Sequence, residues 1–101
     1  MKVPWTRTAL DHLADIYDYV AHDSQRYAQR MVDRITARSK QVAGFPESAP
    51  VVVEYGDPAI REVIEGPYRL IYRVESDAIV VLAVIHGARL MPPEPPTADG
   101  S

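Results

Sequence analysis

The sequence predicts an α+β fold, in which an N-terminal αα-hairpin packs on one face of a twisted antiparallel β-sheet. Apolar residues recur at helical spacing over residues 9–42, whereas residues 51–86 consist mainly of β-branched and apolar runs separated by short turns. Helices and strands that are segregated in this way along a chain are typical of α+β domains. The 101 residues, 47% of them hydrophobic, suffice for one domain with a small core.

The first helix is predicted to follow a short extended segment over residues 1–5. Thr6 or Thr8 can cap this helix, because a hydroxyl at that position accepts from the free amide groups of the first turn. Three aspartates fall on the outer face of the helix. Apolar residues at helical spacing form its inner face: Ala9, Leu13, Ile16, Tyr17 and Val20.

The second helix is predicted to begin after Asp23 or Ser24 and to end near Gly44, because Pro46 cannot continue it. Its inner face is apolar: Ala28, Met31, Val32, Ile35 and Val42. Arginines recur every four residues on its outer or flanking side: Arg26, Arg30, Arg34 and Arg38. Such a stripe is typical of a solvated helix face, and it can also attract an acidic partner. Few residues link the two helices, so we expect antiparallel neighbours.

The C-terminal half is predicted to form strands at residues 51–55 and 60–65, followed by two strands within residues 68–89. Residues 92–101 are Pro-rich and polar, and we expect them to be disordered. The sequence therefore predicts a single domain over residues 1–91.

The last two strands carry cations among apolar residues. A turn at residues 76–77 would place Arg69 opposite Val84, and residues opposite each other share a face. One face is then predicted to pack on the helices: Tyr68, Leu70, Tyr72, Val74, Ile79, Val81, Ala83 and Ile85. The other face would hold Arg69, Ile71, Arg73, Val80, Leu82, Val84 and His86, with Arg89 leaving the strand at the same end. This second face is predicted to be a binding surface with an apolar floor and a cationic rim.

Composition excludes several classes of function. The formal net charge is -3, so no global basic field points to direct nucleic-acid binding by this chain. The absence of cysteine excludes disulfides and thiolate metal sites, and no histidine pair has metal-ligand spacing; we expect no metal and no cofactor. The first ten residues have no apolar signal core, and no run approaches the ~20 apolar residues of a membrane span. We therefore expect a soluble, cytoplasmic protein.

Several segments together resemble the RelE/ParE superfamily of bacterial type II toxins. The segment WTRTALDHLADIYDYVA is followed by IREV, YRLIYRV and VIHGAR, and the resemblance covers residues 3–90 in the same order. It implies a toxin encoded beside an antitoxin that wraps it, is acidic in its toxin-binding part, and joins it in repressing their operon. RelE-like members of the superfamily are ribosome-dependent mRNA endoribonucleases, whereas ParE-like members inhibit DNA gyrase and are not nucleases.

The pattern of the nuclease branch is only half present. RelE-like enzymes use paired lysines, two arginines and a C-terminal tyrosine to stabilise charge and move protons during cleavage. Arg69 and Arg89 match the two arginines, but Ile60 and Glu62 occupy the lysine positions and the C-terminal region is Pro-rich. Glu62 would place negative charge where a phosphate should bind.

The resemblance therefore favours a ParE-like toxin that inhibits DNA gyrase by protein–protein contact and has no catalytic residues. One alternative is a ribosome-dependent mRNA endoribonuclease, with Arg69 as phosphate clamp, His86 as general acid or base, and Arg89 stabilising the transition state. Other nuclease branches pair a C-terminal histidine with a glutamate, for which Glu54 is the candidate. A third reading is a non-toxic member that binds its antitoxin and regulates the operon.

Two surfaces follow from this interpretation. The predicted target-binding surface consists of Arg61, Arg69, Arg73, His86 and Arg89. The predicted antitoxin-binding surface is an apolar groove beside the helices with nearby arginines: Tyr17, Tyr27, Arg30, Met31 and Arg34.

Overall fold

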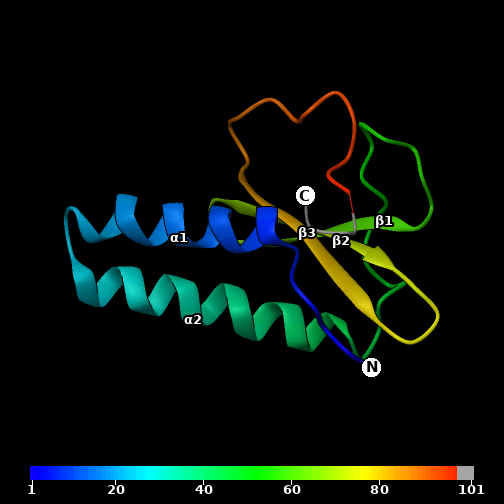
Figure 1. Ribbon diagram of the computed structural model, residues 1–101, viewed down its shortest axis with the longest axis horizontal. Coiled ribbons are helices and arrows are strands. Elements are labelled where there is room, and N and C mark those ends of the chain that lie inside the picture. Colours follow the sequence, from blue (N-terminus) through cyan, green and yellow to red (C-terminus); the bar gives the residue numbers. More distant parts are fainter. Residues whose placement is uncertain (98–101) are drawn as a thin grey trace.

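The computed structural model describes residues 1–97, in which two helices pack on a three-stranded sheet (Figure 1). The elements are α1 (Arg7–Ala21), α2 (Gln25–Val42), β1 (Ile60–Glu65), β2 (Tyr68–Val74) and β3 (Ile79–His86). The strand order is β1-β2-β3, and both pairs of neighbours are antiparallel. The α+β prediction is confirmed, since α1 packs on β3 and α2 on β1 from one side of the sheet. None of the helices within residues 1–97 is long and apolar enough to cross a membrane.

Hydroxyl caps begin both helices. The Thr6 Oγ1 accepts from the amide of Ala9 at 3.0 Å, and the Ser24 Oγ accepts from the amide of Tyr27 at 3.1 Å. Each cap satisfies an amide that has no partner within its helix, so both starts follow from local chemistry. At the other end of α2 the C-cap is Ala43, one residue before the predicted glycine.

The N-terminal segment lies alongside the outer edge of β3. Lys2 bridges to Ala78 and Trp5 bridges to Val81, both in the parallel sense. The amide of Thr6 also donates to the carbonyl of Val81 at 3.0 Å. These bonds occupy backbone groups of β3 that would otherwise form an exposed sheet edge.

A β-bulge in the β2–β3 hairpin changes the predicted register. From the turn inward the pairing is as predicted as far as Tyr72, which lies opposite Val81. The next pair is Ile71 with Ala83, so Leu82 is an extra residue on β3. Because side chains alternate along a strand, one extra residue reverses the face of every residue that follows it.

The prediction for the end of this hairpin was therefore wrong. Arg69 lies opposite Ile85 rather than Val84, and Tyr68 lies opposite His86. Ile85 consequently belongs to the cluster on the second face, whereas Val84 belongs to the core beneath the helices. His86 shares the helix-facing side with Tyr68 and is not on the face of Arg69.

The second face of the sheet is covered rather than open. Its apolar residues form a second buried cluster: Val52, Ile60, Ile71, Val80, Leu82, Ala83 and Ile85. Tyr55 from the preceding loop and Met91 from the tail pack against this cluster. Figure 1 shows the segment that follows β3 curling back towards that loop. The expected open apolar floor is thus the inside of a second small core.

The predicted strand at residues 51–55 does not form. Val51 makes only an isolated bridge to Arg61, and Val52 is fully buried in the second core. The chain then turns, because the amide of Gly56 donates back to the carbonyl of Val52 at 3.1 Å. Burial of one valine against the sheet therefore prevails over the β-propensity of the segment.

The tail departs from the predicted boundary at residue 91. The hydroxyl of Tyr55 donates to the carbonyl of Pro92 at 3.0 Å, so contact with the domain continues past Met91. Residues 92–97 contain no helix or strand. Residues 98–101, which the sequence also placed in a disordered tail, lie outside the described residues.

Candidate functional site

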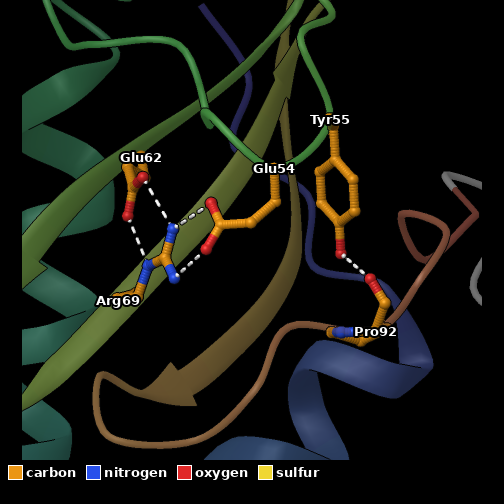
Figure 2. Close-up of polar contacts among 5 residues, drawn as sticks. All are labelled: Glu54, Tyr55, Glu62, Arg69 and Pro92. Atoms are coloured by element: carbon orange, nitrogen blue, oxygen red, sulfur yellow. Dashed lines mark hydrogen bonds and ion pairs between the residues drawn. The ribbon is translucent and has the colours of Figure 1, made fainter.

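Arg69 lies at the centre of an ion-pair cluster on the second face (Figure 2). Its Nε donates to Glu62 Oε1 at 2.7 Å and its Nη2 donates to Glu62 Oε2 at 2.9 Å. Its Nη1 and Nη2 donate to the two carboxylate oxygens of Glu54 at 2.8 and 2.9 Å. The guanidinium is therefore bound bidentately on two sides, by one carboxylate from β1 and one from the loop before it.

The positive charge of this cluster is compensated within it, because the Arg69 guanidinium is bound by the carboxylates of Glu54 and Glu62. The hydrogen bonds from Arg69 lower the pKa of the Glu54 carboxyl from 4.5 to about 2. Hydrogen bonds to Glu54 and then to Glu62 raise the pKa of the Arg69 guanidinium further above its usual value. One cation held between two carboxylates has no unsatisfied positive charge to offer a phosphate. Arg69 consequently anchors the loop to the sheet.

Two further arginines of the predicted target surface, Arg61 and Arg73, also contact the 47–59 loop. Arg61 lies opposite Tyr72, so it is on the helix-facing side of the sheet and not on the second face. Its guanidinium donates to the carbonyls of Glu47, Ala49 and Pro58 at 2.8–3.0 Å. Arg73 approaches Asp57, with 3.6 Å between Nη1 and Oδ2.

His86 and Arg89 line a hollow of about 550 Å³ between α1 and the end of β3. The ring of Tyr68 meets the imidazole of His86 edge to face, with 5.6 Å between centroids. The Nδ1 of His86 accepts from the amide of Ala88 at 3.1 Å, which fixes the ring orientation. The remaining polar residues of the lining come from α1: His12, Asp15 and Tyr19.

His12 of α1 contributes to this hollow, although it was not among the predicted site residues. Its Nδ1 accepts from the amide of Val84 at 3.2 Å. Burial lowers the pKa of His12 below its usual 6.5, against the opposing effect of Asp15 and Asp11, and Arg89 lowers it further. The signal was present in the sequence, because His12 lies three residues after Ala9 and four before Ile16, on the inner stripe of the helix.

The three residues proposed for catalysis are not brought together. His86 and Arg89 share the hollow beside α1, whereas Arg69 lies on the opposite face with its carboxylates. Glu54, the candidate partner of a catalytic histidine, is likewise bound to Arg69 on that other face. Within residues 1–97 no three histidine or acidic side chains could hold a metal ion.

The predicted antitoxin surface is split between core and solvent. Met31 is buried in the main core and Tyr17 is half-buried, whereas Tyr27 and Arg30 are exposed. Arg34 forms an ion pair with Glu65 at the end of β1, with 2.6 Å between Nη2 and Oε2. Exposed side chains of this set therefore lie at the beginning and middle of α2.

Comparisons with known proteins agree with this architecture. A family model described as "ParE toxin of type II toxin-antitoxin system, parDE" matches residues 3–91. The chain is 32% identical over 90 residues to Toxin RelE2 of Caulobacter vibrioides, covering 88% of this chain and 98% of that protein. It also resembles a solved structure of the chromosomal ParDE TA system from P. aeruginosa, with a TM-score of 0.69 and 25% identity over 85% of this chain and 95% of the other. The chain therefore belongs to the ParE toxin family of type II toxin–antitoxin systems, within the RelE/ParE superfamily.

Proposed function

We propose that this ParE-family toxin inhibits DNA gyrase by protein–protein contact, without catalytic residues of its own, and that a cognate antitoxin neutralises it. The observation that carries the proposal is the position of Arg69. The residue that a nuclease would use as phosphate clamp is bound by Glu54 and Glu62, and it faces away from His86 and Arg89.

The energetics of the cluster support a non-enzymatic role. A phosphate could reach Arg69 only by displacing at least one bidentate carboxylate, and hydrogen bonds to charged groups contribute roughly 1.5–3 kcal/mol each. The remaining carboxylate would repel the phosphate at close range. Glu62 is nearly buried, with 12% of its side chain exposed, so it cannot swing away into solvent without opening the second core. RNA cleavage through Arg69 would therefore require rearrangement of the 47–59 loop.

The surfaces for the two partners then lie on different parts of the molecule. The target is contacted by the cationic groups at the sheet end, of which His86 and Arg89 are exposed. Arg61, Arg69 and Arg73 support this surface by holding the loops in place. The antitoxin binds along the helix pair through the exposed Tyr27, Arg30 and Arg34 and the half-buried Tyr17, whereas Met31 is buried and supports this surface from the core. Both partners are encountered inside the cell.

A second candidate function is a ribosome-dependent mRNA endoribonuclease. It is supported by the name of the relative Toxin RelE2 and by the gathering of two histidines with Arg89 around one hollow. In that case His86 would act as general acid or base and Arg89 would stabilise the transition state. A third candidate, a non-toxic member that regulates its operon with the antitoxin, requires that expression of this chain alone leaves growth unaffected.

Parallel assays of the purified chain, freed from its antitoxin, separate these functions. The gyrase proposal predicts loss of supercoiling and accumulation of gyrase–DNA cleavage complexes, with coupled translation unchanged. Blocked translation with mRNA cut at the ribosome, and intact supercoiling, would instead establish the nuclease. Prior addition of the antitoxin should restore the affected activity in either case and serves as the control for contaminating enzymes.

A further inference from the structure

We propose that the hollow between α1 and the end of β3 is a carboxylate-binding pocket, which receives an acidic side chain of a partner protein. It is a defined cavity of about 550 Å³, formed by residues of α1, the β1–β2 turn and the segment that ends β3. The inference rests on the proposed function in one respect, namely that this chain acts through contact with other proteins.

Hydrogen-bond donors without partners surround this hollow. Within residues 1–97 the guanidinium of Arg89 makes no hydrogen bond or ion pair, and neither does the hydroxyl of Tyr68. Tyr68 is 7% exposed, yet no buried side-chain polar atom of the described residues lacks a partner. Its hydroxyl must therefore open to the hollow, where an anion can accept from it.

The two histidines add donors of the same kind. Each Nδ1 already accepts from a backbone amide, that of Val84 for His12 and that of Ala88 for His86. A neutral imidazole whose Nδ1 is an acceptor carries its proton on Nε2, which is then a donor. Two imidazole N–H groups, the phenols of Tyr19 and Tyr68 and a guanidinium thus surround one cavity, against the single carboxylate of Asp15.

Charge and shape favour a carboxylate over a phosphate. Arg89 is the one permanently charged cation among the lining residues, and Asp15 opposes it, so a singly charged anion is a better match than a phosphate dianion. The net charge of -3 for the chain also opposes a polyphosphate backbone. Ile16, Val84 and Pro67 provide an apolar wall, against which the methylene stem of a glutamate or its apolar neighbours can pack.

The test is a titration of the purified full chain, followed by NMR on the imidazole resonances of His12 and His86. The probes are the capped tripeptide acetyl-Leu-Glu-Leu-amide, its Gln counterpart and inorganic phosphate. We expect saturable shifts with the Glu peptide, at least fivefold tighter than with the Gln peptide or phosphate. Equal binding of the two peptides would overturn the proposal, and so would tighter binding of phosphate.

Two variants make the assignment specific. Arg89→Gln should weaken binding of the Glu peptide at least fivefold, and Tyr68→Phe, which keeps the ring and removes the hydroxyl, should weaken it by a smaller factor. The matched control is Arg7→Gln. Arg7 is exposed on the first turn of α1, the helix that forms one side of the hollow, but it is not among the residues that line the hollow. Unchanged binding in Arg89→Gln would contradict the proposal, provided that its amide spectrum shows the native fold.

The same variant identifies the source of the carboxylate. Because exposed Arg89 lies on the proposed target surface and outside the antitoxin-binding set, we expect gyrase to supply it: Arg89→Gln should weaken gyrase inhibition at least fivefold and leave antitoxin affinity unchanged. Weaker antitoxin binding with gyrase inhibition at full strength would contradict this source. Retention of both activities at full strength would overturn the pocket's role in partner binding. Loss of the gyrase proposal is separately visible, because wild-type protein would then fail to inhibit gyrase while the Glu peptide still bound.

Discussion

The imidazole of His12 on α1 accepts a hydrogen bond from the amide of Val84 on β3, with 3.2 Å between Nδ1 and N. Val84 follows the bulge at Leu82, and the carbonyl of Leu82 accepts from the hydroxyl of Thr6 at 3.3 Å. Two side chains from the first helix region therefore satisfy backbone groups at the irregular part of the strand. The bulge, which decides the face of His86, is stabilised from outside the sheet.

This relationship predicts a dependence of stability on pH. Because burial lowers the pKa of His12 in the folded chain, the unfolded chain binds the extra proton first as the pH falls. The contribution of neutral His12 is complete above its unfolded pKa of 6.5 and is lost as the pH falls through its folded pKa. The slope cannot exceed about 1.4 kcal/mol per pH unit for one proton.

Denaturant unfolding of wild type and His12→Gln between pH 5 and 7.5 measures this effect. Gln cannot titrate, while His22 and His86 remain in both proteins, so the difference between the two curves isolates His12. The difference in unfolding free energy should change with pH below 6.5 and be constant above it. Parallel curves across the whole range would show that His12 titrates alike in the folded and unfolded chains.

Removal of Arg69 should destabilise the fold. Arg69→Ala would leave Glu62 unpaired at 12% exposure, whereas Glu54, at 42%, can turn to solvent. Because one carboxylate remains poorly hydrated, we expect a loss of about 2–3 kcal/mol in unfolding free energy, below the value for a fully buried pair. Arg26→Ala, at an exposed position of α2, should lie within about 0.5 kcal/mol of wild type and controls for loss of charge. A similarly small effect for Arg69→Ala would refute the anchoring role.

The second core can be tested with a pair of isoleucines. Ile71 is fully buried on the second face, so Ile71→Ala should cost about 2–5 kcal/mol through lost burial and the cavity that remains. Ile64 on β1 is 57% exposed, and Ile64→Ala should stay within about 0.5 kcal/mol of wild type. Equal, small effects at both positions, measured by urea unfolding, would mean that the loop and tail do not cover this face.

The turn between β1 and β2 requires a glycine at position 66, because the backbone there has a positive φ. Gly66 has φ 56°, and an added Cβ would lie 3.6 Å from Met31 Cε, so space is adequate and the strain is conformational. Gly66→Ala should therefore lower the unfolding free energy by about 1–2 kcal/mol. Gly44 lacks a positive φ, and Gly44→Ala should be neutral or slightly stabilising. Thermal unfolding of the two variants would contradict this explanation if they shifted the midpoint equally.

What the sequence could predict was set by local chemistry and periodicity. The caps at Thr6 and Ser24 depend on atoms three residues away, and the helical stripes depend on spacing alone. The strands β1, β2 and β3 likewise form where β-branched and apolar residues predicted them. These signals were sufficient for the helix pair, the antiparallel hairpins and the face that the helices cover.

What it could not predict depended on contacts distant in the chain. Leu82 at the bulge is bound by Thr6 and Val84 beyond it by His12, across separations of 76 and 72 residues in the chain. Val52 packs against the sheet instead of extending as a strand, and no local pattern distinguishes these two outcomes. These two features divide the predicted cationic surface into an anchored Arg69 and an Arg89 whose guanidinium has no partner within residues 1–97.

The most direct test of the central claim is a titration of gyrase supercoiling with the free chain, at a fixed gyrase concentration well above the inhibition constant. An inhibitor that acts by protein contact must be consumed stoichiometrically, so inhibition should rise linearly and saturate at a simple ratio of toxin chains to gyrase subunits. Supercoiling that remains intact at a large molar excess, while a catalytic amount of the same preparation stops translation, would contradict the account.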